Sequence, residues 1–145
     1  MKLQFVPGLH RAAHRVALYL DATSPPLRLT QGECHLLAHL HESGPEPVGA
    51  LHAAFAHKRS TLTSYLDRLE GAGLITRALR PEDRRSFLVS LTASGKAAAA
   101  RVHRRLARLE EAALARVSPR DVRGFLAVLE GLQERAVDTE KRRKR

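Results

Sequence analysis

Hydrophobic residues recur at helical spacing along most of the chain. Apolar stripes with a period near 3.6 predict amphipathic helices. Six helices are predicted in this way, over residues 3–22, 30–43, 47–56, 58–72, 93–117 and 119–137. After Gly73 the period changes to 2, which predicts strands over residues 74–79 and 86–91. The pattern therefore predicts a mainly α-helical fold with one small β-hairpin.

Short polar signals mark where several of these helices begin and end. Residues 30–33 read Thr-Gln-Gly-Glu, a capping box in which the hydroxyl and the carboxylate each bond to the other residue's amide. Thr92 is the predicted N-cap of the fifth helix, and residues 118–121, Ser-Pro-Arg-Asp, are predicted to start the sixth. Gly73 stands where a left-handed residue would end the fourth helix.

The fourth predicted helix has two contrasting faces. One is an apolar stripe that we expect to be buried, formed by Leu62, Tyr65, Leu66 and Leu69. The other carries short hydroxyls flanked by cations, which predicts a helix in the DNA major groove, where hydroxyls meet base edges and cations meet phosphates. An ordinary surface helix could have the same composition. The candidate DNA-binding residues here are Lys58, Arg59, Ser60, Thr61, Thr63, Ser64 and Arg68.

A polar loop with three arginines joins the two predicted strands. Two helices joined by a tight turn and followed by a basic hairpin form a winged helix-turn-helix, predicted over residues 28–92. Cations at the hairpin tip would lie along DNA, and an arginine gains most in a narrow minor groove. The alternative is a turn that serves only solubility. We expect Asp83 to pair with a neighbouring arginine and to fix the rotamer of the one that inserts.

The helices outside this region are long for a single domain of 145 residues. The fifth would span roughly 37 Å at 1.5 Å per residue. Because such helices have little to pack on within one copy, residues 3–22 and 93–137 are predicted to be dimerisation helices that pair with a second copy of the chain. The alternative is a monomeric helical hairpin.

Charge favours a polyanionic partner. The formal net charge is +10 and the pI is about 11.0, which favours nucleic acid first and an anionic membrane surface second. Half of that excess comes from the all-basic residues 141–145, within a predicted disordered tail over residues 138–145. Aromatic residues make up only 4% of the chain, which argues against base-stacking platforms for single strands.

No segment predicts secretion or a membrane span. There is no run of 18 apolar residues, and His and Arg side chains interrupt the first 20 residues, where a signal peptide would need an apolar core. The single cysteine, Cys34, excludes an internal disulfide and fits a reducing compartment. The sequence therefore predicts a cytoplasmic protein that binds duplex DNA and no membrane.

The ordered series of motifs resembles the MarR family of dimeric winged-helix transcription regulators. The resemblance covers residues 29–102, and its most specific part is the Asp-x-Arg wing followed by Leu-Thr-x-x-Gly. The motifs that carry it are Leu29-Thr30, Arg59-Ser60-Thr61-Leu62-Thr63, Asp67-Arg68-Leu69-Glu70, Gly73-Leu74, Arg77, Asp83-Arg84-Arg85-Ser86, and Val89-Ser90-Leu91-Thr92 with Gly95.

The resemblance implies a homodimer whose two wings straddle a pseudo-palindromic operator. It also implies a repressor that leaves DNA when a small molecule, an oxidant or a metal binds. Arg85 would reach the minor groove and Asp83 would orient the basic side chains. The full set of wing candidates is Arg77, Asp83, Arg84, Arg85 and Ser86.

Three positions depart from the family pattern. Ala56 stands where the turn commonly has glycine, and a residue with a side chain there is expected to change the turn. His57 replaces an apolar turn residue. Arg80 stands where the wing usually has an acid, which predicts tighter and more salt-sensitive DNA binding.

A small-molecule effector is a possible partner, but the sequence does not identify it, and the candidate sensing groups are weak. Cys34 lacks a nearby resolving cysteine and is better read as a small core residue than as a redox switch. The i, i+4 pairs His10/His14 and His35/His39 lack a third ligand at fixed spacing, so no metal site is predicted. Arg11, Arg15 and His39 are the candidates for contacts with an anionic ligand.

Three functional hypotheses remain from the sequence. The first is the sequence-specific DNA-binding regulator; the second is a winged-helix module that binds protein, with DNA affinity confined to the basic tail. The third is a non-specific DNA-binding protein. An enzyme is not predicted, and neither is a cofactor, because the chain has no Gly-x-Ser-x-Gly, no paired-cysteine motif and no complete phosphate loop.

Overall fold

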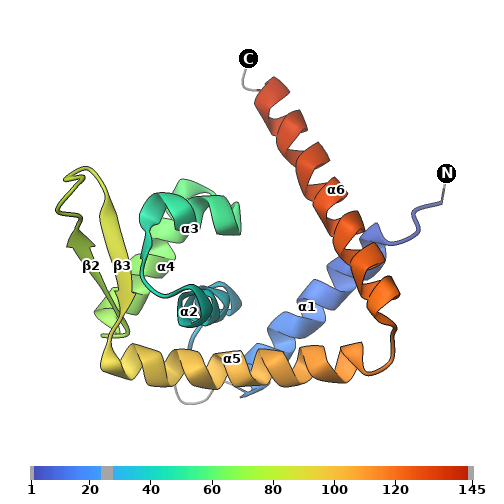
Figure 1. The fold of residues 1–145 in the computed structure, drawn as a ribbon, viewed down its shortest axis with the longest axis horizontal. Helices are drawn as coiled ribbons and strands as arrows, with labels where there is room; N and C mark the ends of the chain where they lie inside the picture. Colours follow the sequence, from blue (N-terminus) through green and yellow to red (C-terminus); the bar gives the residue numbers. More distant parts are fainter. Residues whose placement is uncertain (1, 24–27, 144–145) are drawn as a thin grey trace. The chain divides into compact units, whose positions relative to one another are not determined.

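The computed structural model describes residues 2–23 and 28–143, and the side chains of residues 2–22 and 28–136. It is mainly helical, with a small antiparallel sheet, as predicted (Figure 1). The elements are α1 (Val6–Thr23), α2 (Gln31–Ser43), β1 (Glu46–Pro47), α3 (Val48–Phe55), α4 (Arg59–Gly71), β2 (Ile75–Leu79), β3 (Phe87–Leu91), α5 (Ala93–Leu114) and α6 (Pro119–Arg143). The chain forms two units, residues 1–106 and 107–145.

The first unit contains a winged helix-turn-helix. Helices α3 and α4 are joined by a tight turn, and the β2–β3 hairpin follows α4 (Figure 1). The sheet has the order β1-β3-β2, and β1 was not predicted. Two residues, one of them Pro47, are too few to show a strand period. β1 is held by its pairing with Val89 and Leu88 of β3.

The core of this unit is built mostly from leucine. The stripe predicted for α4 is confirmed: Leu62, Leu66 and Leu69 are buried and Tyr65 packs against the core. Cys34 is fully buried among these side chains, as expected for a small core residue. The other buried apolar residues are Leu20, Leu29, Leu36, Leu37, Ala38, Leu40, Leu51, Leu74, Ile75, Val89, Ala98, Ala99 and Val102.

The predicted helix signals are confirmed. The capping box of α2 forms, with Thr30 and Glu33 bonded to each other's amides. Gly73 has φ +70°, and the Leu74 amide reaches the Leu69 carbonyl at 2.9 Å, which is the Schellman ending of α4. At the start of α6, Ser118 and Asp121 bond to each other in the same way as the first capping box.

The last two helices begin where they were predicted to begin, but their C-terminal ends differ from the prediction. α5 ends at Leu114 rather than near residue 117, and α6 continues to Arg143 rather than ending near 137. Residues 138–143 of the predicted disordered tail are therefore helical, since Lys, Arg and Glu are good helix formers. Residues 144 and 145, and the side chains of the whole tail, lie outside the described part.

Several large apolar residues of the predicted dimerisation helices are exposed in the single chain. Phe125 and Leu126 of α6 are each 56% exposed, and Phe5 and Val117 are also exposed. Within the described residues, no helix is both long and apolar enough to cross a bilayer.

Candidate nucleic-acid interface

The turn before α4 keeps the left-handed geometry that glycine usually supplies. Ala56 has φ 50° and ψ 20°, so the expectation that a side chain here would change the turn is wrong. The conformation costs about 1 kcal/mol for a residue with a Cβ. Packing offsets this cost, because the His57 ring lies 6.3 Å from the Phe55 ring and edge-on to Tyr65 at 5.6 Å.

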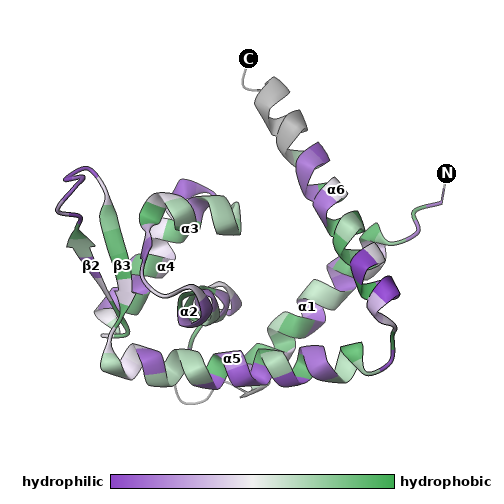
Figure 2. Cartoon of the chain, viewed as in Figure 1, coloured by the Kyte–Doolittle hydropathy of each residue, from purple (hydrophilic) through white to green (hydrophobic). Residues whose placement is uncertain are grey.

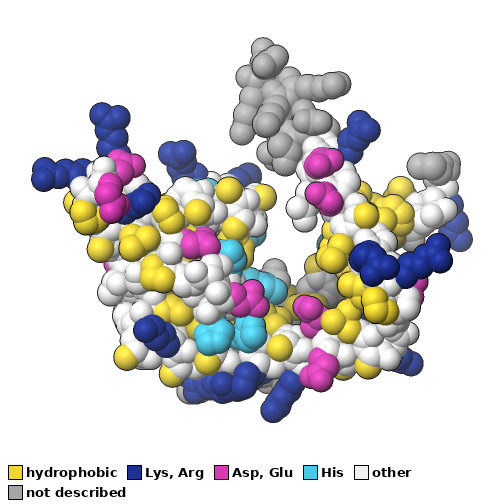
Figure 3. Space-filling view, in the orientation of Figure 1, with side chains coloured by type: hydrophobic (Ala, Val, Ile, Leu, Met, Phe, Trp, Pro, Cys, Tyr) yellow, Lys and Arg dark blue, Asp and Glu magenta, His cyan; other side chains and the backbone are white. Residues whose placement is uncertain are grey.

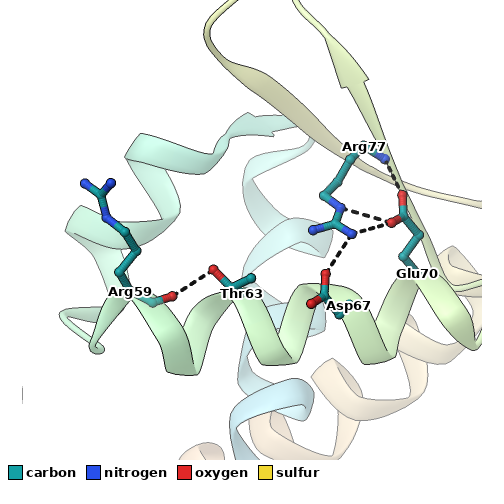
Figure 4. Close-up of polar contacts among 5 residues, drawn as sticks. All are labelled: Arg59, Thr63, Asp67, Glu70 and Arg77. Atoms are coloured by element: carbon teal, nitrogen blue, oxygen red, sulfur yellow. Dashed lines mark hydrogen bonds and ion pairs between the residues drawn. The ribbon is translucent and has the colours of Figure 1, made fainter.

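Helix α4 begins without a side-chain cap. Its N-cap is Lys58, whose side chain makes no cap hydrogen bond, so the first amides and the positive end of the helix dipole are left for another acceptor. Arg59, Ser60 and Thr63 are exposed beside it. The Thr63 hydroxyl donates to the Arg59 carbonyl at 2.9 Å (Figure 4). Thr61 and Ser64 are half-buried.

Arg68 is half exposed but is paired with other side chains of the protein. Its Nε bonds to the carboxylate of Glu33, which is only 3% exposed, and its guanidinium donates to the Ser64 hydroxyl at 2.8 Å. The same group lies 5.5 Å from the centre of the Tyr65 ring. These contacts connect the start of α2 to α4 and occupy two nitrogens of a side chain that was predicted to contact DNA.

Arg77 connects the wing to α4. Its guanidinium lies 2.8 Å from Asp67 Oδ1 and 2.5 Å from Glu70 Oε2, and its amide donates to Glu70 at 3.2 Å (Figure 4). Hydrogen bonds from Arg77 lower the pKa of Glu70, and the bond to Glu70 raises the pKa of Arg77. Both changes favour the ion pair, so Arg77 acts between two elements of the protein.

The wing tip (residues 80–86) is organised through its backbone. Asp83 Oδ1 accepts a hydrogen bond from the Arg85 amide at 3.0 Å, and the Ser86 amide donates to the Asp83 carbonyl at 3.1 Å. The expected pairing of Asp83 with an arginine side chain is therefore replaced by an Asx-type turn. Among the described residues, Arg84 and Arg85 have no carboxylate partner, whereas Arg80 lies 3.6 Å from Glu82.

The figures show the contrast between strands and tip. Strand β3 is largely hydrophobic and the loop that connects it to β2 is hydrophilic (Figure 2). Lys and Arg side chains project from the hairpin end in the space-filling view (Figure 3). The candidates thus separate into two groups. Arg68 and Arg77 are paired with carboxylates, and among the described residues Lys58, Arg59, Arg84 and Arg85 are not.

Sequence reasoning missed the acidic partners of these ties. Glu33 was assigned only to the capping box, and the roles of Asp67 and Glu70 toward Arg77 were not considered. A carboxylate at the N3 position of a helix can serve both its own cap and a neighbouring cation. Glu33 contacts Arg68, which is 35 residues away, and nothing in the neighbouring sequence predicts that contact.

The candidate sensing residues do not come together. His10 and His14 are exposed, while His39 lies 3.0 Å from Glu46 and His35 is half-buried, which lowers its pKa. In the described part of the chain, no three His, Cys, Asp or Glu residues are placed to hold a metal ion. Arg11 and Arg15 are exposed on α1.

Comparisons with known proteins agree with this geometry. The family model described as "MarR family" matches residues 29–87. The chain is 35% identical over 83 residues to the uncharacterized HTH-type transcriptional regulator YcgE of Bacillus subtilis (strain 168). These 83 residues make up 57% of this chain. The matched stretch spans 54% of that relative's length.

Two solved structures extend the likeness to nearly the whole chain. A probable transcriptional regulator from Pseudomonas aeruginosa is 31% identical with a TM-score of 0.71, covering 87% of this chain and 96% of its own. MepR of S. aureus, in its DNA-binding conformation, has a TM-score of 0.83 at 18% identity, covering 92% and 99%. With the winged fold and the matching family model, these findings show that the chain belongs to the MarR family.

Proposed function

We propose that this protein is a homodimeric, sequence-specific DNA-binding repressor. The observation that carries the proposal is the pairing of an uncapped, hydroxyl-lined start of α4 with a wing whose tip arginines are exposed. Arg77 holds these two surfaces in one unit through Asp67 and Glu70. A fixed spacing between a groove-reading helix and a cationic tip is what readout of a defined duplex requires.

In this proposal the two groups of arginines have different tasks. Lys58 and Arg59 meet phosphates beside the major groove, while Ser60 and Thr61 face base edges. Arg84 and Arg85 meet the minor groove at the wing tip. Arg68 and Arg77 act as positioning residues, because their guanidinium groups are already held by carboxylates.

The exposed apolar residues of the long helices support a second copy as the partner. Phe125 and Leu126 of α6 and Phe5 near the start of α1 are large apolar side chains in contact with water in the single chain. Patches of this kind mark protein interfaces. In a two-fold dimer, the two α4 helices would enter successive major grooves about 34 Å apart, which requires a pseudo-palindromic operator.

Release by a small-molecule effector is part of the proposal, and the identity of the effector is left open. The family resemblance is its support. Arg11, Arg15 and His39 are the candidate anion contacts, and His39 already has Glu46 as a partner at 3.0 Å. An effector that uses His39 would therefore have to compete with this pair.

Selection of bound sites from random duplexes tests the proposed function. We expect a two-fold motif to be recovered, and expect Arg85→Ala to weaken binding to it and to lower the salt slope by about one per wing. Deletion of residues 139–145 should leave specific binding in place. If specific binding is lost with the tail, or if random duplexes bind as tightly as the selected ones, the proposal is wrong and the protein-binding or non-specific hypothesis takes its place.

A further inference from the structure

We propose that Leu79 and Phe87, which we call the apolar rung, pack against the deoxyribose walls of the minor groove that the wing tip enters. This inference rests on the proposed function and adds a contact of a different kind to it. The charged contacts of the wing depend on salt, whereas contact between these side chains and the C–H surface of the sugars does not.

The sheet register places the apolar rung beyond the end of the core. Leu79 lies opposite Phe87, two residues along from the pair Arg77 and Val89. Side chains two residues apart in a strand share a face, so the apolar rung is on the face that Arg77 turns toward α4. Val89 is fully buried, but Leu79 is 55% exposed and Phe87 is 45% exposed. The protein's own core therefore ends one pair before the apolar rung.

Its surroundings identify DNA as the occupant. The wing tip begins at the next residue after Leu79 and ends just before Phe87, and it carries the exposed Arg84 and Arg85. These cations would attract a polyanion to the apolar rung. An uncharged partner would give no reason for exposed arginines beside it. Figure 3 shows hydrophobic side chains on the hairpin close to the basic tip.

Duplex DNA offers an apolar surface at this position. The walls of the minor groove are lined by the C–H groups of deoxyribose, and proteins that bind this groove frequently bring apolar side chains such as Phe and Leu into it, where they insert between base steps. An aromatic and a leucine side chain that are directly paired across two strands also form a preorganised surface. Binding would therefore remove both from water with little loss of side-chain freedom.

The experiment compares Phe87→Ala and Leu79→Ala with Phe87→Leu, which keeps an apolar side chain, and with Thr76→Ala, a change at an exposed strand residue. The probe is the duplex recovered by selection, together with the random pool, because sugar contacts do not depend on sequence. Affinity is measured across a salt series, and hydroxyl-radical footprinting reports which deoxyriboses are covered.

We expect each alanine variant of the apolar rung to bind roughly tenfold more weakly, with the salt slope unchanged and the wing's minor-groove protection reduced. Phe87→Leu and Thr76→Ala should bind nearly as well as the wild type. If an alanine variant disordered the whole wing, the Arg85 contact would also be lost and the salt slope would become less negative. A change in the salt slope of these variants would therefore overturn the inference.

Unchanged affinity and footprint in Phe87→Ala would also overturn it. If regulation in cells were lost while DNA affinity stayed the same, a protein partner would be indicated instead of DNA. Failure of the proposed function looks different, because Arg85→Ala would then have no effect either.

Discussion

Gly95, in the first turn of α5, provides a test in which two physical rules predict opposite signs. Alanine is favoured over glycine in helices by about 1 kcal/mol, so propensity alone predicts that Gly95→Ala stabilises the protein. A Cβ at this position would lie 1.8 Å from the carbonyl oxygen of Leu74 and 2.8 Å from its carbon. Ordinary contacts begin at 3.4 Å. Packing therefore predicts the reverse.

The backbone that would have to yield is firmly held. The Leu74 carbonyl accepts the Thr92 amide at 3.0 Å, and the Thr92 hydroxyl donates to the Gly73 carbonyl at 2.7 Å. Overpacking costs about 1–3 kcal/mol and a lost hydrogen bond about 1 kcal/mol, from which about 1 kcal/mol of helix propensity is subtracted. We expect Gly95→Ala to lower the free energy of unfolding by about 1–3 kcal/mol, which corresponds to a fall in Tm of about 3–10 °C.

The matched control is Gly49→Ala, in α3. A Cβ there would meet nothing within 4 Å in the described structure, so this change should stabilise the protein by about 0.5 kcal/mol. Both variants are unfolded in urea and followed by circular dichroism at one protein concentration, because dimerisation would make stability depend on concentration. If Gly95→Ala were as stable as Gly49→Ala, the close approach of α5 to Leu74 would be refuted.

Three further changes test the ties and the titrating groups. Arg77→Ala should weaken operator binding about tenfold without changing the salt slope, because the wing loses its connection to α4; filter binding across a salt series measures both. Burial lowers the pKa of His35 in the folded state, so the stability it contributes is present above pH 6.5 and is lost as the pH falls below that value. Urea midpoints between pH 7.5 and 5 should therefore change less in His35→Gln. The Ser118 hydroxyl and amide lower the pKa of Asp121, so the stability of this cap is present above pH 3.8 and is lost in more acidic solution. Ser118→Ala should remove this dependence from the helical circular dichroism signal.

The sequence predicted the elements whose causes are local. The capping box at Thr30, the left-handed Gly73 and the change of period at the hairpin all follow from neighbouring residues, and all three are present. β1 escaped prediction because it depends on pairing with a strand some 40 residues away. Residues 93–137 were predicted to pair with a second copy, and Phe125 of α6 is exposed in the single chain.

The candidate site was harder to predict because a sequence does not show which cations are already paired. Composition cannot separate Arg85, which stands at an exposed tip, from Arg68, which reaches a buried carboxylate. Asp83 shows the same difficulty. Its proximity to arginines predicted an ion pair, but the Arg85 amide is the nearer donor in a tight turn.

The difference between paired and unpaired cations has a measurable consequence for DNA binding. The logarithm of the binding constant falls with the logarithm of salt concentration with a slope of about −0.9 for each phosphate neutralised. If all six predicted cations of each protomer acted on phosphates, a dimer would have a slope of about −11. If only the cations without a carboxylate partner act, the slope should be about −7. Among the described residues, those cations are Lys58, Arg59, Arg84 and Arg85.

A chain lacking residues 139–145 allows this difference to be measured without the basic tail. The contrast between single positions is sharper still, because Arg84→Gln should make the slope less negative by about one per protomer. Arg68→Gln, made together with Glu33→Gln so that no buried carboxylate is left unpaired, should leave it unchanged. A slope near −11, or one that falls as much for Arg68 as for Arg84, would mean that DNA displaces Glu33 and takes the Arg68 guanidinium for itself.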